Sequence, residues 1–233
     1  MPKKGKNYKK AVELIDSATA YPLDRAVELI KETSPVKFDA SVDICMVTGL
    51  DTRHADQQLR GAIGLPHGTG KETRVAVFAT GEKEIEARDA GADIVGGEDL
   101  LKEIKGGRMD FDLVLATPDM MKFVGQLGRI LGPRGMMPNP KTGTVTPNIG
   151  EAVKEYKAGK VNFRADSGGL ILSKVGRVSF EASALKENIQ TFVGFVLKNR
   201  PTGAKGQYIK KVVLSSTMGP GIRLDIKDIS LPA

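Results

Sequence analysis

The hydrophobic residues of this chain follow one pattern at its two ends and another in its middle. From Val36 the apolar and polar side chains alternate, and the apolar ones share a face: Phe38, Ala40, Val42, Ile44 and Met46. A period of two is typical of a half-buried strand in an antiparallel sheet. The same period predicts strands at 161–165, 170–178 and 208–218, so both ends of the chain contribute to this part of the fold.

Helices are predicted beside these strands. A solvated basic arm at residues 3–10 leads into a helix that is expected to end near Ala18. A second helix is predicted over 23–33, where Asp24 is placed to cap it, and a third over 185–198.

The middle of the chain instead alternates short apolar strands with helices. Strands are predicted at 74–79, 93–96 and 111–116, and helices at 82–90, 98–104, 118–131 and 148–157. This alternation is typical of right-handed βαβ crossovers around a small parallel sheet.

The predicted fold class is therefore α/β and α+β, in two domains. Residues 1–67 and 159–233 are expected to form a discontinuous α+β domain, an antiparallel sheet with helices. Residues 68–158 are expected to form an inserted Rossmann-like βαβ domain of three layers. The termini of such a discontinuous domain can lie close together.

The two crossings between these domains are rich in glycine. Gly68, Gly70 and Gly159 are predicted to act as hinge or turn residues. The first crossing, LPHGTGK, is not a phosphate-binding loop, because Glu72 stands where that motif needs Ser or Thr.

A long Gly/Pro-rich stretch, residues 125–147, carries Arg129, Arg134 and Lys141 and contains no Asp or Glu. Long loops without regular structure are usually functional or disordered. Met136 and Met137 in its centre favour an ordered loop. Two interpretations remain open, a positively charged functional face and a packed surface loop with incidental charges.

Charge separates the two predicted domains. The chain has 233 residues, a net charge of +7 and a pI near 9.4. Residues 1–67 and 159–233 hold 22 Lys and Arg against 14 Asp and Glu, whereas residues 68–158 hold 13 against 14. The excess positive charge therefore belongs to the discontinuous domain, and a nucleic acid is the expected partner. Because aromatic residues make up only 5% of the chain, wide base-stacking platforms are not expected.

Other function classes lack support in the sequence. One cysteine, Cys45, and two histidines, His54 and His67, predict a buried thiol, no disulfide and no metal site. No catalytic motif is found, so no cofactor is expected. No membrane span is found either, and a cytoplasmic location is expected. Two alternatives stay open: an enzyme that binds a nucleotide at the α/β insertion, and a DNA-binding regulator.

The stretch GQLGRILGPRGMMPNPKTGTVTP closely resembles the signature of the first large-subunit ribosomal protein, the L-one family, in its bacterial form. Further segments resemble the family in the same order: KFDASVDI, DTRHADQQLRG, LPHGTGK, AGADIVGGEDL, KAGKVNFRADSGG and SSTMGPG. The resemblance covers nearly the whole chain, and the family has the same discontinuous two-domain layout.

The resemblance implies a non-enzymatic protein, a monomer when free, that binds large-subunit rRNA at the mobile stalk beside the tRNA exit site. It also implies assistance in the release of deacylated tRNA from that site, and translational repression of its own operon through the mRNA leader. The implied RNA-binding residues lie in the discontinuous domain: Glu28, Phe38, Ser41, Arg164, Asp166, Ser216, Thr217, Met218 and Gly219. Arg129, Arg134 and Lys141 are expected to form a secondary basic contact.

The chemistry of these residues suits RNA. Hydroxyls of Ser216 and Thr217 can bond the ribose 2′-OH, and Gly219 would let RNA approach the backbone. Arg164 suits a phosphate, with Asp166 orienting it. Each residue also has an ordinary interpretation: Phe38 as core, Thr217 as a strand former, and Arg164 with Asp166 as an exposed ion pair.

Overall fold

The computed structural model describes residues 5–16, 18–204 and 206–229. It divides into two compact units, unit 1 with Met1–Gly70 and Val161–Ala233, and unit 2 with Lys71–Lys160. Each unit has its own hydrophobic core. That the units are independently folding domains stays a prediction.

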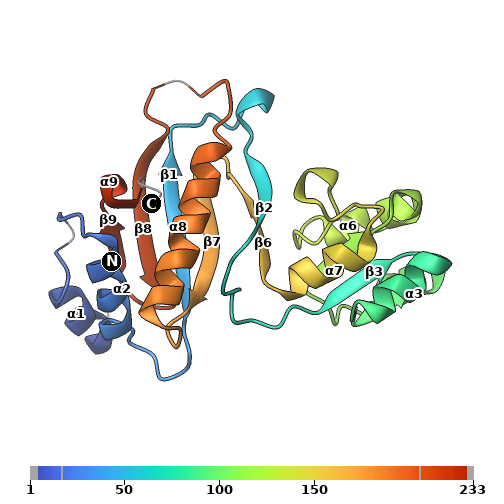
Figure 1. Ribbon diagram of the computed structural model, residues 1–233, viewed down its shortest axis with the longest axis horizontal. Helices are drawn as coiled ribbons and strands as arrows, with labels where there is room; N and C mark the ends of the chain where they lie inside the picture. The colour runs from blue at the N-terminus through green and yellow to red at the C-terminus, as the bar shows by residue number, and fades with distance from the viewer. Residues whose placement is uncertain (1–4, 17, 205, 230–233) are drawn as a thin grey trace. The chain divides into compact units, whose positions relative to one another are not determined.

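Unit 1 is built on a four-stranded antiparallel sheet in the order β7-β1-β8-β9 (Figure 1). The strands are β1 (Ser41–Thr48), β7 (Leu170–Arg177), β8 (Ile209–Ser216) and β9 (Gly221–Leu224). β1 is hydrogen-bonded on both edges, with Cys45 opposite Leu172 of β7 and Val213 of β8. The predicted antiparallel strand is thus confirmed, with partners from the other end of the chain.

One face of this sheet is covered by two helices, α2 (Leu23–Glu32) and α8 (Ala182–Lys198). Alternate residues of β1 face these helices and are fully buried: Val42, Ile44 and Met46. Phe38 was expected on the same buried face, but β1 begins only at Ser41 and the Phe38 side chain is 60% exposed. The core interpretation of Phe38 is therefore wrong.

The remaining described elements of unit 1 are α1 (Lys6–Glu13), the 3₁₀ helix η1 (Ala55–Gln57), β2 (Arg60–Gly64), β6 (Lys160–Arg164) and α9 (Ile226–Ile229). Their bounds differ in detail from the predicted ones. β2 and β6 pair with each other in a separate two-stranded sheet. The basic arm is helical from Lys6 onward, whereas residues 3–4 lie outside the described part of the chain. Asp24 does not cap α2; instead the Leu23 N–H donates to Asp228 at 2.8 Å.

Unit 2 is a three-layer α/β structure around a parallel sheet in the order β4-β3-β5. Its strands are β3 (Val75–Phe78), β4 (Ile94–Gly96) and β5 (Leu113–Ala116). Helices α3 (Glu82–Asp89) and α7 (Ile149–Lys157) pack on one face, and α4 (Glu98–Lys105), α5 (Met121–Val124) and α6 (Gly128–Leu131) on the other. The parallel pairing confirms the predicted βαβ pattern.

The helix predicted over 118–131 is broken into short pieces. The 3₁₀ helices η2 (Pro118–Met120) and η3 (Gly125–Leu127) interrupt it, and a fourth, η4 (Pro140–Thr142), follows. Glycine disfavours the interior of a regular helix, and Gly125 and Gly128 stand at the breaks.

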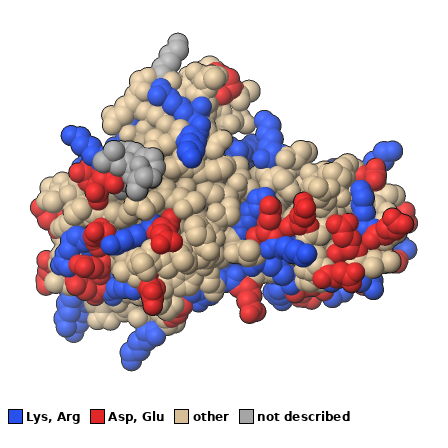
Figure 2. Space-filling view, viewed as in Figure 1, with Lys and Arg blue, Asp and Glu red and all other residues tan. Residues whose placement is uncertain are grey.

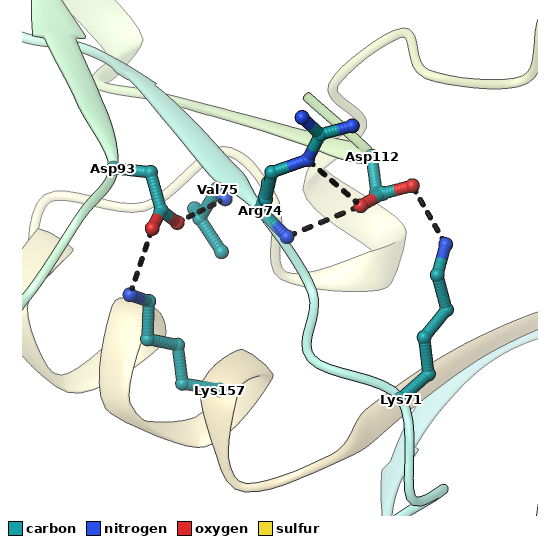
Figure 3. Close-up of polar contacts among 6 residues, drawn as sticks. All are labelled: Lys71, Arg74, Val75, Asp93, Asp112 and Lys157. Carbon is teal, nitrogen blue, oxygen red and sulfur yellow. Dashed lines mark hydrogen bonds and ion pairs between the residues drawn. The ribbon is translucent and has the colours of Figure 1, made fainter. Parts of the chain in front are cut away.

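Two carboxylates, those of Asp93 and Asp112, link neighbouring segments of unit 2 near the starts of its strands (Figure 3). Asp112 accepts hydrogen bonds from Lys71 Nζ at 2.7 Å and from the Arg74 N–H at 3.2 Å. Asp93 accepts from the Val75 N–H at 2.8 Å and from Lys157 Nζ at 3.3 Å. The hydrogen bond from Lys71 is the main cause that lowers the pKa of Asp112.

Asp112→Asn is expected to lower the free energy of unfolding by about 1 kcal/mol at pH 7, because the charge-assisted bond from Lys71 is lost. A carboxyl whose pKa is lowered by folding stabilises above its unfolded pKa of about 3.9, and this contribution is lost as pH falls through the folded pKa. Urea titrations should therefore show a difference that disappears in strong acid. Asp110→Asn is the matched control, since Asp110 is 71% exposed and lies 3.7 Å from Arg108. Equal losses in both variants would contradict the role of Asp112.

Candidate nucleic-acid interface

One group of the predicted RNA-binding residues gathers at the end of the sheet where β1 begins. The Thr217 N–H donates to the Ser41 carbonyl at 3.0 Å, and the Ser41 N–H donates to Thr217 Oγ1 at 3.2 Å. Met218 and Gly219 follow directly, and Phe38 lies three residues before Ser41. The structure therefore brings together residues from distant parts of the chain, since Ser41 and Thr217 are 176 positions apart.

Met218 is held in an unusual conformation by the turn that follows β8. The Gly219 N–H donates to the Ser216 carbonyl at 2.9 Å, which closes a four-residue turn. Met218 has a φ of 65°, the one positive value at a described residue other than glycine. Its side chain is 74% exposed. Such a conformation costs on the order of 1 kcal/mol and is common at functional sites.

Ser216 and Gly219 contact each other inside this turn. Ser216 is only 4% exposed, and its Oγ has no hydrogen-bond partner among the described residues. A Cβ atom on residue 219 would lie 2.2 Å from that Oγ. The Ser216 hydroxyl therefore occupies the space that a Cβ atom at residue 219 would need, and in this structure this hydroxyl does not reach the surface.

A second group lies at the other end of the sheet. Arg164 ends β6, and the Asp166 N–H donates to the carbonyl of Leu170, the first residue of β7. Leu170 is paired with Val47, so this group is about 20 Å along β1 from Ser41. The Asp166 carboxylate accepts the N–H groups of Gly168 and Leu170 at 2.8 and 2.9 Å, which shapes the turn. It forms no ion pair with Arg164 in the described structure.

Between these two groups lies the face of the sheet that α2 and α8 do not cover, here called the open face. Its residues follow from the strand register: Asp43, Cys45 and Val47 of β1, Leu172 and Lys174 of β7, Lys211, Val213 and Ser215 of β8, and Arg223 of β9. None of them is fully buried. The sequence pattern alone does not bring Lys174, Lys211 and Arg223 together, because the register of four strands is needed to place them on one face.

Two cations of the helical face of unit 1 are ion-paired, although Lys198 of α8 is exposed and has no ion pair in the described part of the chain. On the helical face Arg25 pairs with Glu28 at 2.9 Å, and Lys186 pairs with Asp24. Figure 2, viewed from the side of α8, shows Lys and Arg intermixed with Asp and Glu. On the open face Lys174, Lys211 and Arg223 have no ion pair within 4.0 Å in the described part of the chain. Glu28, a predicted RNA contact, is thus an ion-paired residue of α2.

Asp43 is the acidic residue among these open-face positions. Partial burial raises the pKa of Asp43, and the positive charge of Lys174, its neighbour across the strands, opposes the rise. Burial also raises the pKa of the Cys45 thiol, with Asp166 adding to the effect. Cys45 was expected to be buried but is half-buried, since it faces away from the helices.

The Gly/Pro-rich stretch of unit 2 is ordered by its own contacts. Asn139 accepts the Lys141 N–H through its side chain at 2.9 Å, and its own N–H donates to Thr144 Oγ1 at 2.7 Å. Met136 and Met137 pack against the core, and Val145 forms a parallel bridge to Ala116 at the end of β5.

The basic residues of this stretch are Arg129, Arg134 and Lys141. All three are exposed and lack an ion pair in the described structure. The surface of the stretch is therefore positively charged.

The predicted hinge glycines have backbones that favour glycine. Gly68, Gly70 and Gly159 have φ values of 63°, 70° and 106°. The first crossing is also attached to unit 1: buried Asn188 of α8 donates to the Gly68 carbonyl at 3.0 Å and accepts the His67 N–H at 3.1 Å. Hinge motion at these glycines stays a prediction.

Other kinds of site lack a structural basis in the described residues. They contain no cluster of three or more His, Cys, Asp or Glu side chains that could hold a metal ion. None of the helices described is both long and apolar enough to cross a membrane.

Comparison with known families identifies the chain over most of its length. Residues 30–220 match the model of the ribosomal protein L1p/L10e family. The chain belongs to this family. Membership in the L1p/L10e family makes it a ribosomal protein of the large subunit that binds rRNA, and such proteins are generally structural rather than enzymatic.

Gly219→Ala is expected to lower the free energy of unfolding by about 1–3 kcal/mol through the clash with Ser216 Oγ. Ser216→Ala alone should be nearly neutral, because the hydroxyl it removes is buried without a partner. The double variant should regain most of the stability in urea titrations. If it is stable but has lost RNA affinity, RNA contacts the backbone at Gly219 and the glycine is not there for packing alone.

Proposed function

We propose that the chain binds the mobile stalk of large-subunit rRNA through the open face of unit 1 and the two residue groups at its ends. The observation that carries the proposal is the set of exposed cations without ion pairs, Lys174, Lys211 and Arg223, on the face between those groups. Cations that the protein leaves unpaired are available to replace the counterions of a phosphate backbone. The ion-paired cations of α2 and α8 are less suited to this role.

The groups at the two ends supply contacts of a different kind. Exposed Phe38 and Met218 offer apolar surfaces to sugars or bases. Thr217, a half-exposed residue next to Met218, carries a hydroxyl that is bonded to the Ser41 backbone. At the other end Arg164 is exposed and able to contact a phosphate. The role of Asp166 in this proposal is to shape the turn beside Arg164, since its Oδ1 accepts the backbone N–H groups of Gly168 and Leu170.

Lys174→Ala, Lys211→Ala and Arg164→Ala should each reduce the salt dependence of binding to a stalk rRNA transcript by about one unit of slope. Filter binding over a range of salt concentrations measures it. The matched control is Lys186→Ala, which removes the same charge from the helical face and should leave the slope unchanged. A slope that falls equally for all four variants would show that net charge, not the open face, determines binding.

A neutral substitution completes this test. Thr217→Val should weaken binding by about 1–3 kcal/mol without changing the slope, and Thr217→Ser should bind as the parent does. The unfolding of both variants needs the same measurement, because Thr217 also bonds to Ser41. Duplex DNA of matching sequence and free nucleotides serve as competitors; effective competition by either would favour the DNA-binding or the enzymatic alternative.

We further propose a division of labour between the units. Unit 1 anchors the protein on rRNA, and the basic stretch of unit 2, with Arg129, Arg134 and Lys141 exposed, makes transient contacts with tRNA at the exit site and assists release of deacylated tRNA. Hinge motion at Gly68, Gly70 and Gly159 would give unit 2 the required freedom. The same anchoring surface would bind a similar RNA fold in the leader of its own operon mRNA and repress translation.

Replacing residues 71–160 by a short Gly/Ser linker should leave a folded fragment with most of the affinity for the stalk transcript. In the full chain, Arg134→Glu with Lys141→Glu should also spare this affinity but slow the release of deacylated tRNA from ribosomes that carry the variant. Asp99→Lys with Glu103→Lys alters charge elsewhere on unit 2 and is the control. Loss of transcript binding by the folded double variant would place the basic stretch in the anchor.

A further inference from the structure

Beside the Met218 turn lies a groove in which Met218 is the one lining residue that also belongs to the proposed RNA contacts. It is an open groove of about 600 Å³ in unit 1. Three segments line it: Lys6, Asn7 and Tyr8 at the start of α1, Pro35 and Val36 between α2 and β1, and Met218 itself. A groove of this size lies within the range of small-molecule sites.

The groove joins an apolar surface to a positive charge. Tyr8, Pro35, Val36 and Met218 provide flat or apolar side chains, Lys6 provides a cation, and none of the lining residues is acidic. α1 as a whole carries Lys6, Lys9 and Lys10 against a single acidic residue, Glu13. An anionic occupant with a flat apolar part is complementary to this surface.

Met218 connects the groove to the proposed RNA surface. Its side chain is 74% exposed although it is apolar, and its backbone is held at a φ of 65°. The turn thus directs an apolar side chain to the groove at some cost in backbone strain. A bound group that covers Met218 would recover the free energy of burying it.

We infer that the groove takes one unstacked nucleotide of the bound RNA, with its base against Tyr8 and Met218 and its phosphate near Lys6. Unstacked bases in RNA loops bind by stacking on aromatic side chains, and this contact is sequence-tolerant. The Asn7 amide, also in the lining, carries donor hydrogens and an acceptor oxygen that suit a base edge. This inference rests on the proposed function and adds α1 to the RNA-binding surface.

The test uses the full chain and the stalk rRNA transcript. Tyr8→Leu removes the aromatic ring but keeps an apolar side chain, and should weaken binding roughly 5- to 100-fold with an unchanged salt slope. Tyr8→Phe keeps the ring and should bind as the parent does. Lys6→Gln should lower the slope by about one unit, whereas Lys10→Gln, on the same helix but outside the groove lining, should not.

Abasic substitutions at the unpaired nucleotides of the transcript identify the base. At one position the abasic change should weaken the parent roughly 5- to 100-fold yet hardly affect Tyr8→Leu, since both changes remove the same contact. If Tyr8→Leu binds like the parent, or if no position is coupled to Tyr8, the groove inference is wrong and the proposed function stands. If the parent itself does not bind the transcript, both are wrong. Circular dichroism and thermal melting confirm that each variant is folded.

Discussion

Unit 1 depends on the hydrogen bonding of β1 along both of its edges to strands from the far end of the chain. Ser41 pairs with Arg177 of β7, and Val42 pairs with Ser216 of β8. This pairing places α2 and α8 on the same face, leaves the opposite face open and brings the Met218 turn beside the start of β1. The groove depends on it too, because its three segments come from residues 6–8, 35–36 and 218.

The hydrophobic pattern along the sequence predicted the positions of the helices and strands better than the burial of individual side chains. The alternation around Val42, Ile44 and Met46 identified both the strand and its buried face. The burial of Ser216 could not be seen in this way, because it depends on which side of β8 faces the helices and on the packing of Gly219 against its hydroxyl. Phe38 continues the alternation in the sequence, but the strand starts three residues later, at Ser41. The periodic pattern alone therefore predicted too long a strand.

The predicted RNA residues show the same limit. The sequence placed Arg164 and Thr217 in one domain but could not show that they stand at opposite ends of a sheet, with the open face between them. Nor could it show that Glu28 and Asp166 already have partners within the protein. Such facts depend on contacts between residues far apart in sequence, and charge counts do not report them. The separation of paired from unpaired cations is therefore a property of the fold.

The position of β1 also has a consequence for the timing of synthesis. Residues 71–160 are contiguous and leave the ribosome before β7 and β8, whereas β1 has to wait for both of its partners. At ordinary rates of translation, the chain from the end of β1 to the end of β8 takes roughly 10 to 30 s to make. During that interval the open face does not exist. A nascent chain therefore cannot present Lys174, Lys211 and Arg223 on one face before β8 has emerged and paired.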